Sequence, residues 1–127
     1  MYRNILFAVL LFLSPAAASA HAGKGPHGGP LADAGPYYVE LLVQGSELQI
    51  FVFDDKTSTP VGTKGAKGTA VVLVGQKEDK VALQPAAGEA AGGEMEGKAP
   101  AAVGPGARIV VLVQMPGKPS VVARFAM

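Results

Sequence analysis

The sequence predicts a single exported all-β domain, an antiparallel β-sandwich of about six to seven strands with immunoglobulin-like architecture, behind a cleaved signal peptide. Short apolar runs with alternating polar residues are separated by Gly- and Pro-containing turns, which is typical of such folds. No segment after the signal shows the 3.6-residue periodicity of a helix. The chain has no cysteine, so hydrophobic packing must hold the domain together without disulfides. A small β-barrel is the alternative arrangement of the same strands.

The first twenty residues have the order of a secretion signal. Arg3 precedes an unbroken apolar run over 5–13, and Pro15 and a stretch of small residues follow it. Nine helical residues rise roughly 14 Å, about half of a bilayer core, so we expect no stable membrane anchor after cleavage. Cleavage after Ala20 would make His21 the first mature residue. Cleavage after Ala22 also fits the small-residue rule and would discard that histidine.

The mature chain divides into an arm and a domain. Residues 21–36 begin with a segment so rich in Gly and Pro that it predicts a flexible Gly/Pro/His arm, which a ligand or folding back would order. The β-sandwich domain is expected over 37–127. Within it, residues 86–106 are dominated by Ala and Gly and predict a low-complexity loop, with a short strand around 94–98 as the alternative.

The best-defined local prediction is a β-hairpin over 37–53. Its two strands, 37–44 and 47–53, flank Gly45-Ser46, and a two-residue loop with Gly first suits a type II′ turn. This turn pairs Leu41 with Ile50, and the same register gathers apolar pairs on one side of the hairpin. Turn chemistry and side-chain alternation therefore select the same register.

Two more hairpins are expected. Residues 69–74 and 80–84 flank a polar turn, and 107–115 and 120–125 flank Pro116-Gly117, a type II turn signal. The near-continuous apolar run in 107–115 predicts a strand that is covered on both sides.

Composition and motifs argue against several functions. Loss of Arg3 with the signal leaves ten cations and ten carboxylates without a basic stripe, which does not favour nucleic-acid binding. Phosphate-loop, dinucleotide and nucleophile-elbow motifs are absent, so we expect no enzyme. Asp54 and Asp55 are adjacent, and neighbouring strand residues point to opposite faces. Their simplest interpretation is a solvated turn.

The two histidines are the strongest candidates for chemistry. If His21 is the first residue, its α-amine and imidazole offer two nitrogens to one ion, which suits Cu(II). His27 would add a third nitrogen and Asp33 an oxygen. The alternative is a polar tail with solvated histidines. Met95 and Met115 are potential soft ligands for Cu(I), but isolated methionines usually fill gaps in a core.

A resemblance to a known group of proteins adds to the predictions made from the residues. The segment Gly25-Pro-His-Gly-Gly-Pro-Leu-Ala-Asp-Ala-Gly-Pro-Tyr-Tyr-Val-Glu-Leu-Leu-Val resembles a domain found near the N-terminus of periplasmic adaptor (membrane fusion) proteins of heavy-metal efflux pumps, and in small stand-alone exported proteins. The resemblance continues through 48–55, 60–61, 65–74 and 81–85. A looser resemblance, carried by His21 alone, is to small periplasmic copper carriers.

The resemblance implies a periplasmic β-domain that is associated with copper or another divalent cation and with a heavy-metal efflux complex as partner. The chain lacks the helical hairpin of an adaptor, so it resembles only that domain. The resulting prediction is a non-catalytic periplasmic metal-binding module with metal ligands His21, His27 and Asp33. The alternative is an exported protein-interaction or structural β-domain without a metal role.

Overall fold

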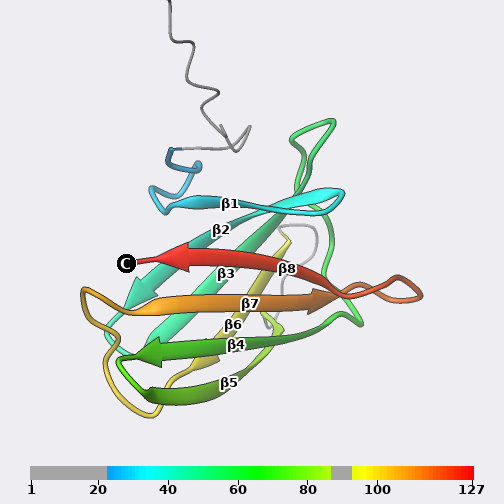
Figure 1. Cartoon of the computed structure of the whole chain (residues 1–127). Coiled ribbons are helices and arrows are strands. Elements are labelled where there is room, and N and C mark those ends of the chain that lie inside the picture. Colours follow the sequence, from blue (N-terminus) through cyan, green and yellow to red (C-terminus); the bar gives the residue numbers. More distant parts are fainter. Residues whose placement is uncertain (1–22, 87–92) are drawn as a thin grey trace, which may run out of the picture.

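The computed structural model describes residues 23–86 and 93–127. These residues form eight antiparallel strands and no helix, so the all-β prediction is confirmed (Figure 1). The strands are β1 (Leu31–Ala34), β2 (Tyr37–Gln44), β3 (Glu47–Asp54), β4 (Lys67–Val74), β5 (Lys77–Pro85), β6 (Glu94–Lys98), β7 (Arg108–Gln114) and β8 (Val121–Ala126). The predicted signal peptide over 1–20 lies outside the described residues. No helix in the described part of the chain is long and apolar enough to cross a membrane.

The strands belong to one sheet in the order β1-β2-β3-β6-β5-β4-β7-β8. The sheet curls until its end strands β1 and β8 lie side by side without hydrogen-bonding, so it is a nearly closed barrel. The predicted immunoglobulin-like sandwich of six to seven strands is not confirmed. Because β5 pairs with both β4 and β6, the sheet does not separate into two. The alternative prediction, a small β-barrel, describes this curled sheet better.

The three predicted hairpins are present, and the β2–β3 hairpin has the predicted register. Leu41 pairs with Ile50 across the β2–β3 turn, where Gly45 has a φ of +61°, as the first position of a type II′ turn requires. Lys118 donates its backbone N–H to the Met115 carbonyl at 3.0 Å across the β7–β8 turn. The alternative short strand at 94–98 is also confirmed as β6, which joins the two halves of the sheet.

The described part of the predicted arm, residues 23–36, is folded back on β2 and contains a strand. Residues 31–34 form the edge strand β1 and pair with β2. Residues 23–30, which we call the N-terminal loop, turn back with a bridge between Lys24 and Pro30. Pro30 also accepts a hydrogen bond from the Leu41 backbone N–H at 3.1 Å. Folding back against β2 therefore satisfies backbone groups that an extended arm would leave to water.

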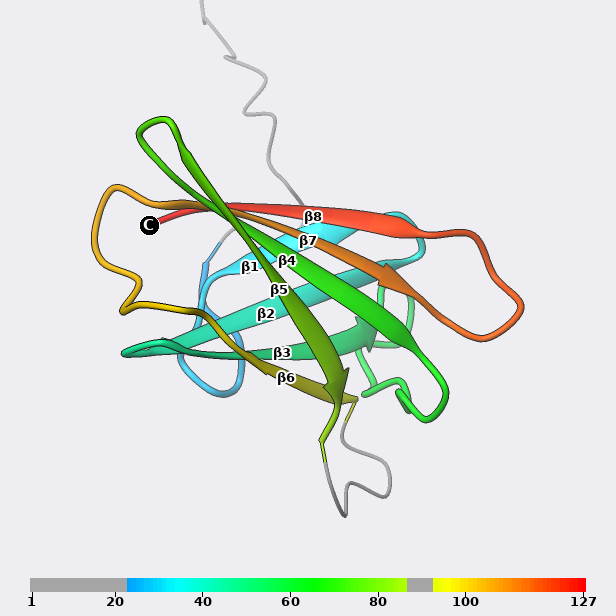
Figure 2. The ribbon, with the colours of Figure 1, turned by 90° about the horizontal axis from the view of Figure 1, so that it is seen from below.

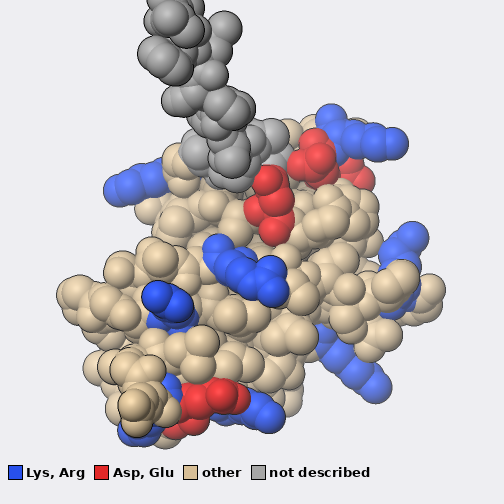
Figure 3. All heavy atoms as spheres, in the orientation of Figure 1, with Lys and Arg blue, Asp and Glu red and all other residues tan. Residues whose placement is uncertain are grey.

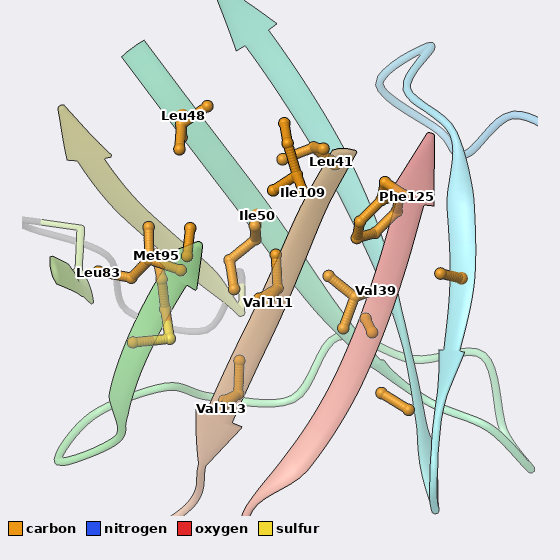
Figure 4. Packing of buried hydrophobic residues seen from close by; sticks show 14 of the residues in the cluster. Val39, Leu41, Leu48, Ile50, Leu83, Met95, Ile109, Val111, Val113 and Phe125 are labelled. Carbon is orange, nitrogen blue, oxygen red and sulfur yellow. The ribbon is translucent and has the colours of Figure 1, made fainter. Parts of the chain in front are cut away.

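The main core lies between the two halves of the curled sheet, which cross in Figure 2. Strand alternation sends every second side chain of each half inward. The buried side chains that meet there come from all eight strands and include Val39, Leu41, Leu48, Ile50, Leu83, Met95, Ile109, Val111, Val113 and Phe125 (Figure 4). Met95 is fully buried and Met115 is 4% exposed, so both pack in this core, as gap-filling methionines do.

Truncation of Met95 tests this packing. Met95→Ala should lower the free energy of unfolding by about 2–5 kcal/mol because it leaves a cavity between the halves. Met95→Leu, which conserves volume, should cost less than about 1.5 kcal/mol. Urea titration followed by circular dichroism measures both, with the exposed Val74→Ala as control. Equal stability of Met95→Ala and the wild type would contradict a close-packed core at this position.

Candidate functional site

The outer side of β2 carries a glutamate in an otherwise apolar surrounding. Glu40 points away from the main core because Val39 and Leu41 on either side of it point inward. Its cross-strand neighbours are Leu31 on β1 and Phe51 on β3. Phe51 belongs to a second, outer cluster of buried aromatic side chains, which also contains Tyr38 and Phe53 and which we call the aromatic cluster. In that cluster the rings of Tyr38 and Phe53 stack at 4.9 Å between centroids.

The N-terminal loop covers this glutamate completely. Glu40 has no exposed surface, although it lies on the outer side of the sheet. Gly25 and Gly29 allow the cover because a Cβ on Gly25 would overlap the Glu40 side chain, and a Cβ on Gly29 would overlap the Leu41 carbonyl oxygen. The loop also turns sharply at Pro26, where Gly28 donates its backbone N–H to the Gly25 carbonyl at 2.9 Å. Glycine at 25 and 29 is therefore a steric requirement of the closed loop.

Three donors of the loop converge on the buried carboxyl group. The backbone N–H groups of His27 and Gly29 donate to Glu40 Oε2 at 2.8 and 2.9 Å. His27 Nδ1 lies 2.7 Å from Glu40 Oε1. An ionised carboxylate accepts all three contacts, because it has no proton to give. In that state Nδ1 is the donor of this pair.

The imidazole of His27 is also fixed from the side. Its ring stacks on Phe51 with 3.7 Å between centroids and 12° between planes, while 43% of the side chain remains exposed. None of the residues in 23–86 and 93–127 forms a hydrogen bond to its Nε2. In the neutral tautomer that carries its proton on Nδ1, Nε2 presents a lone pair. The site therefore consists of one imidazole nitrogen, His27 Nε2, whose direction is set by the contact between Nδ1 and the buried Glu40 carboxyl group.

The structure describes two of the three predicted metal ligands, and it does not place them in a metal-binding cluster. His27 has the position described above, and Asp33 is exposed on the outer side of β1, in register with Tyr38. No group of three or more His, Cys, Asp or Glu residues that could hold a metal ion exists within the described ranges. Asp33 therefore does not complete a cluster with His27 and Glu40. His21 lies outside the described residues.

Sequence reasoning missed the role of Glu40. The signal in the sequence is one carboxylate in the segment Tyr-Tyr-Val-Glu-Leu-Leu-Val of β2, which otherwise contains only apolar and aromatic residues. A charge at such a position needs a hydrogen-bonding partner. The two histidines, one of them thirteen residues upstream, were the natural candidates for that partner.

No protein-family model, curated protein or solved structure matches this chain.

The predicted carboxylate turn after β3 is present and is a local structural feature. Asp54 Oδ1 accepts the backbone N–H groups of Thr57 at 3.0 Å and Lys56 at 2.8 Å. These two hydrogen bonds, the one from Thr57 first, hold the pKa of the exposed Asp54 carboxyl below its ordinary value of 3.8. The ionised side chain closes an Asx-type turn.

This geometry predicts the pH dependence of the turn. Since the folded pKa of Asp54 is below the unfolded one, its stabilising contribution is complete above the unfolded pKa. It is lost as the pH falls through the folded pKa. Asp54→Ala should therefore reduce stability at neutral pH but have little effect at pH 2. Carboxyl-detected NMR titration should place the Asp54 pKa below 3.8, and a midpoint at or above that value would refute this assignment.

Proposed function

We propose that this chain is an exported, non-catalytic module that binds a transition-metal ion through nitrogen ligands near its N-terminus. Cu(II) is the ion that we propose first. The observation that carries the proposal is the His27–Glu40 pair, with the imidazole fixed and its Nε2 directed away from the carboxylate. Metal-binding histidines usually donate their other ring nitrogen to a carboxylate or carbonyl, which sets the tautomer and raises ligand basicity. Glu40 supplies that second contact before any ion binds.

One nitrogen is not enough for tight binding, so further ligands must come from elsewhere in the chain. The sequence offers the imidazole of His21, six residues before His27, and its α-amine if the signal is cleaved after Ala20. Nitrogen donors in tetragonal geometry suit Cu(II). Asp33 is left out of the proposed set because it does not cluster with His27 and Glu40 among the described residues.

The setting of this function follows from the sequence pattern. The predicted secretion signal and the resemblance to the adaptor domain support a periplasmic location and a role accessory to copper or other divalent-cation efflux. A free domain of this size would deliver or retain ions beside such a complex.

The competing proposal is an exported interaction or structural β-domain without a metal role. A specific observation favours it: the His27 ring already stacks on Phe51 and bonds to Glu40. Those two contacts fasten the N-terminal loop to the sheet whether or not an ion binds.

Titration of the mature protein, starting at His21, with Cu(II) separates the two proposals. His27→Ala should weaken binding because it removes a ligand. Glu40→Gln keeps the shape, but its amide N–H would donate to Nδ1 and move the ring proton to Nε2. That variant should bind about 10–100-fold more weakly. Lys24→Gln, a substitution in the same loop that leaves both partners in place, is the matched control.

Isothermal titration gives the affinities, and electron paramagnetic resonance counts the coordinated nitrogens. Thermal melts of each variant without metal separate lost ligands from lost structure. The metal role is rejected if the mature protein binds Cu(II) no more tightly than a scrambled peptide of residues 21–30. It is also rejected if both variants retain full affinity. A loss of stability with unchanged affinity supports the competing proposal.

A further inference from the structure

The outer side of the β5-β4-β7-β8 half of the sheet is unusually apolar for a surface. Val71 on β4 and Val110 on β7 are only half-buried, and Leu112 is 36% exposed. An antiparallel sheet with one solvated face normally carries polar residues there. The apolar run in 107–115 predicted a strand covered on both sides. The structure covers only the side that carries Ile109, Val111 and Val113.

The strand registers place these residues in one continuous patch. Val71 pairs with Val110, and Thr69 with Leu112. Neighbouring outward positions add Leu73 on β4 and Val122 on β8, both half-buried. A shallow groove of about 520 Å³ crosses the patch and is lined by Lys67, Gly68, Thr69, Val71, Lys80, Leu112, Gln114 and Ser120. We call this surface the valine face.

Four cations lie around the valine face, one toward each side. Arg124 on β8 pairs with Val110, and Lys80 on β5 pairs with Val71, so these two flank the patch across the strands. Arg108 and Lys67 lie near its two ends along the strands. Glu78 is the one acidic residue at an outward position of these four strands. In Figure 3 the face over β4, β7 and β8 is largely tan with scattered blue, and red gathers above and below it.

This charge pattern selects among possible occupants. A second copy using the same face would bring like charges together, which is unfavourable. The opposite outer side offers carboxylates at Glu94 and Glu96, but its aromatic cluster is already buried, and His27 stacks on Phe51 there. A membrane surface is disfavoured because no outward residue of these strands is aromatic, and interfacial binding favours Trp and Phe.

We infer that the valine face is a docking site for a partner protein whose contact surface has an apolar centre and a rim of carboxylates. An apolar centre with a polar rim is the usual anatomy of an interface. The seven residues of β7 extend roughly 24 Å, so a helix of about 16 residues would match the face. This inference is independent of metal binding, since the valine face and His27 lie on opposite halves of the sheet.

A stapled peptide helix provides a defined probe. It carries Leu at i, i+3, i+4 and i+7 and Glu on both flanks, with a matched peptide that has Lys in place of Glu. We expect the acidic peptide to bind the mature protein, with NMR shift changes confined to β4, β5, β7 and β8 and with an affinity that falls as salt rises. The basic peptide should not bind.

Variants locate the contact. Arg108→Glu with Arg124→Glu should weaken binding about tenfold, which corresponds to roughly 1.4 kcal/mol. Lys56→Glu with Lys118→Glu changes the net charge equally in exposed turns and should have no effect. Leu112→Ser should also weaken binding, whereas the exposed Val74→Ser should not. Because all these positions are at least partly exposed, the variants should fold, and thermal melts check this.

Several results would overturn the inference. One is failure of the acidic peptide to bind at millimolar concentration, and another is equal binding by the Arg108/Arg124 variant. Shift changes located elsewhere would also reject it. Binding to phosphatidylglycerol vesicles would also overturn the inference if the Arg108/Arg124 or Leu112 variants abolish that binding, because the occupant would then be a membrane. Self-association in sedimentation velocity that the same variants abolish would overturn it as well, because the occupant would then be a second copy.

Discussion

Removal of one carboxylate from water determines the arrangement of the N-terminal part of this protein. Glu40 lies on the outer side of β2 yet has no exposed surface. A buried charge is costly unless hydrogen bonds replace its hydration. Only the N-terminal loop supplies the donors that are seen, two backbone N–H groups and one imidazole nitrogen. The same contacts keep the loop on the aromatic cluster and set the direction of Nε2, so fold and candidate chemistry depend on one interaction.

The two halves of the curled sheet present surfaces of different character. One half carries the covered aromatic cluster and the fixed imidazole, and the other carries the valine face with its cations. Both arise from strand alternation, because each strand sends one side chain in two to the shared core. A module of this kind would hold an ion and a partner protein at the same time, because the two surfaces do not overlap. The two proposals nevertheless stand on separate observations and fail separately.

The sequence predicted the local features of this fold well and the long-range ones poorly. Turn chemistry at Gly45 and Gly117 acts over a few residues, so the sequence predicted both hairpins and, at Gly45, the strand register as well. The continuity of the sheet between its two halves depends on β5 pairing with β6 across residues 87–92, which no local signal specifies. The Glu40–His27 contact spans thirteen residues and requires the loop to fold back, which Gly and Pro permit but do not dictate. His27 was therefore identified as a candidate, whereas its carboxylate partner was not.

Amide hydrogen exchange tests the central interaction most directly. The backbone N–H groups of His27 and Gly29 donate to the buried Glu40 carboxylate, so they should exchange with protection comparable to that of core amides in β2 and β3. Glu40→Ala should remove this protection while leaving that of the β2–β3 hairpin largely in place. Exchange of both amides at the rate of an unstructured peptide in the wild type would contradict the account, because the loop would then not cover the carboxylate in solution.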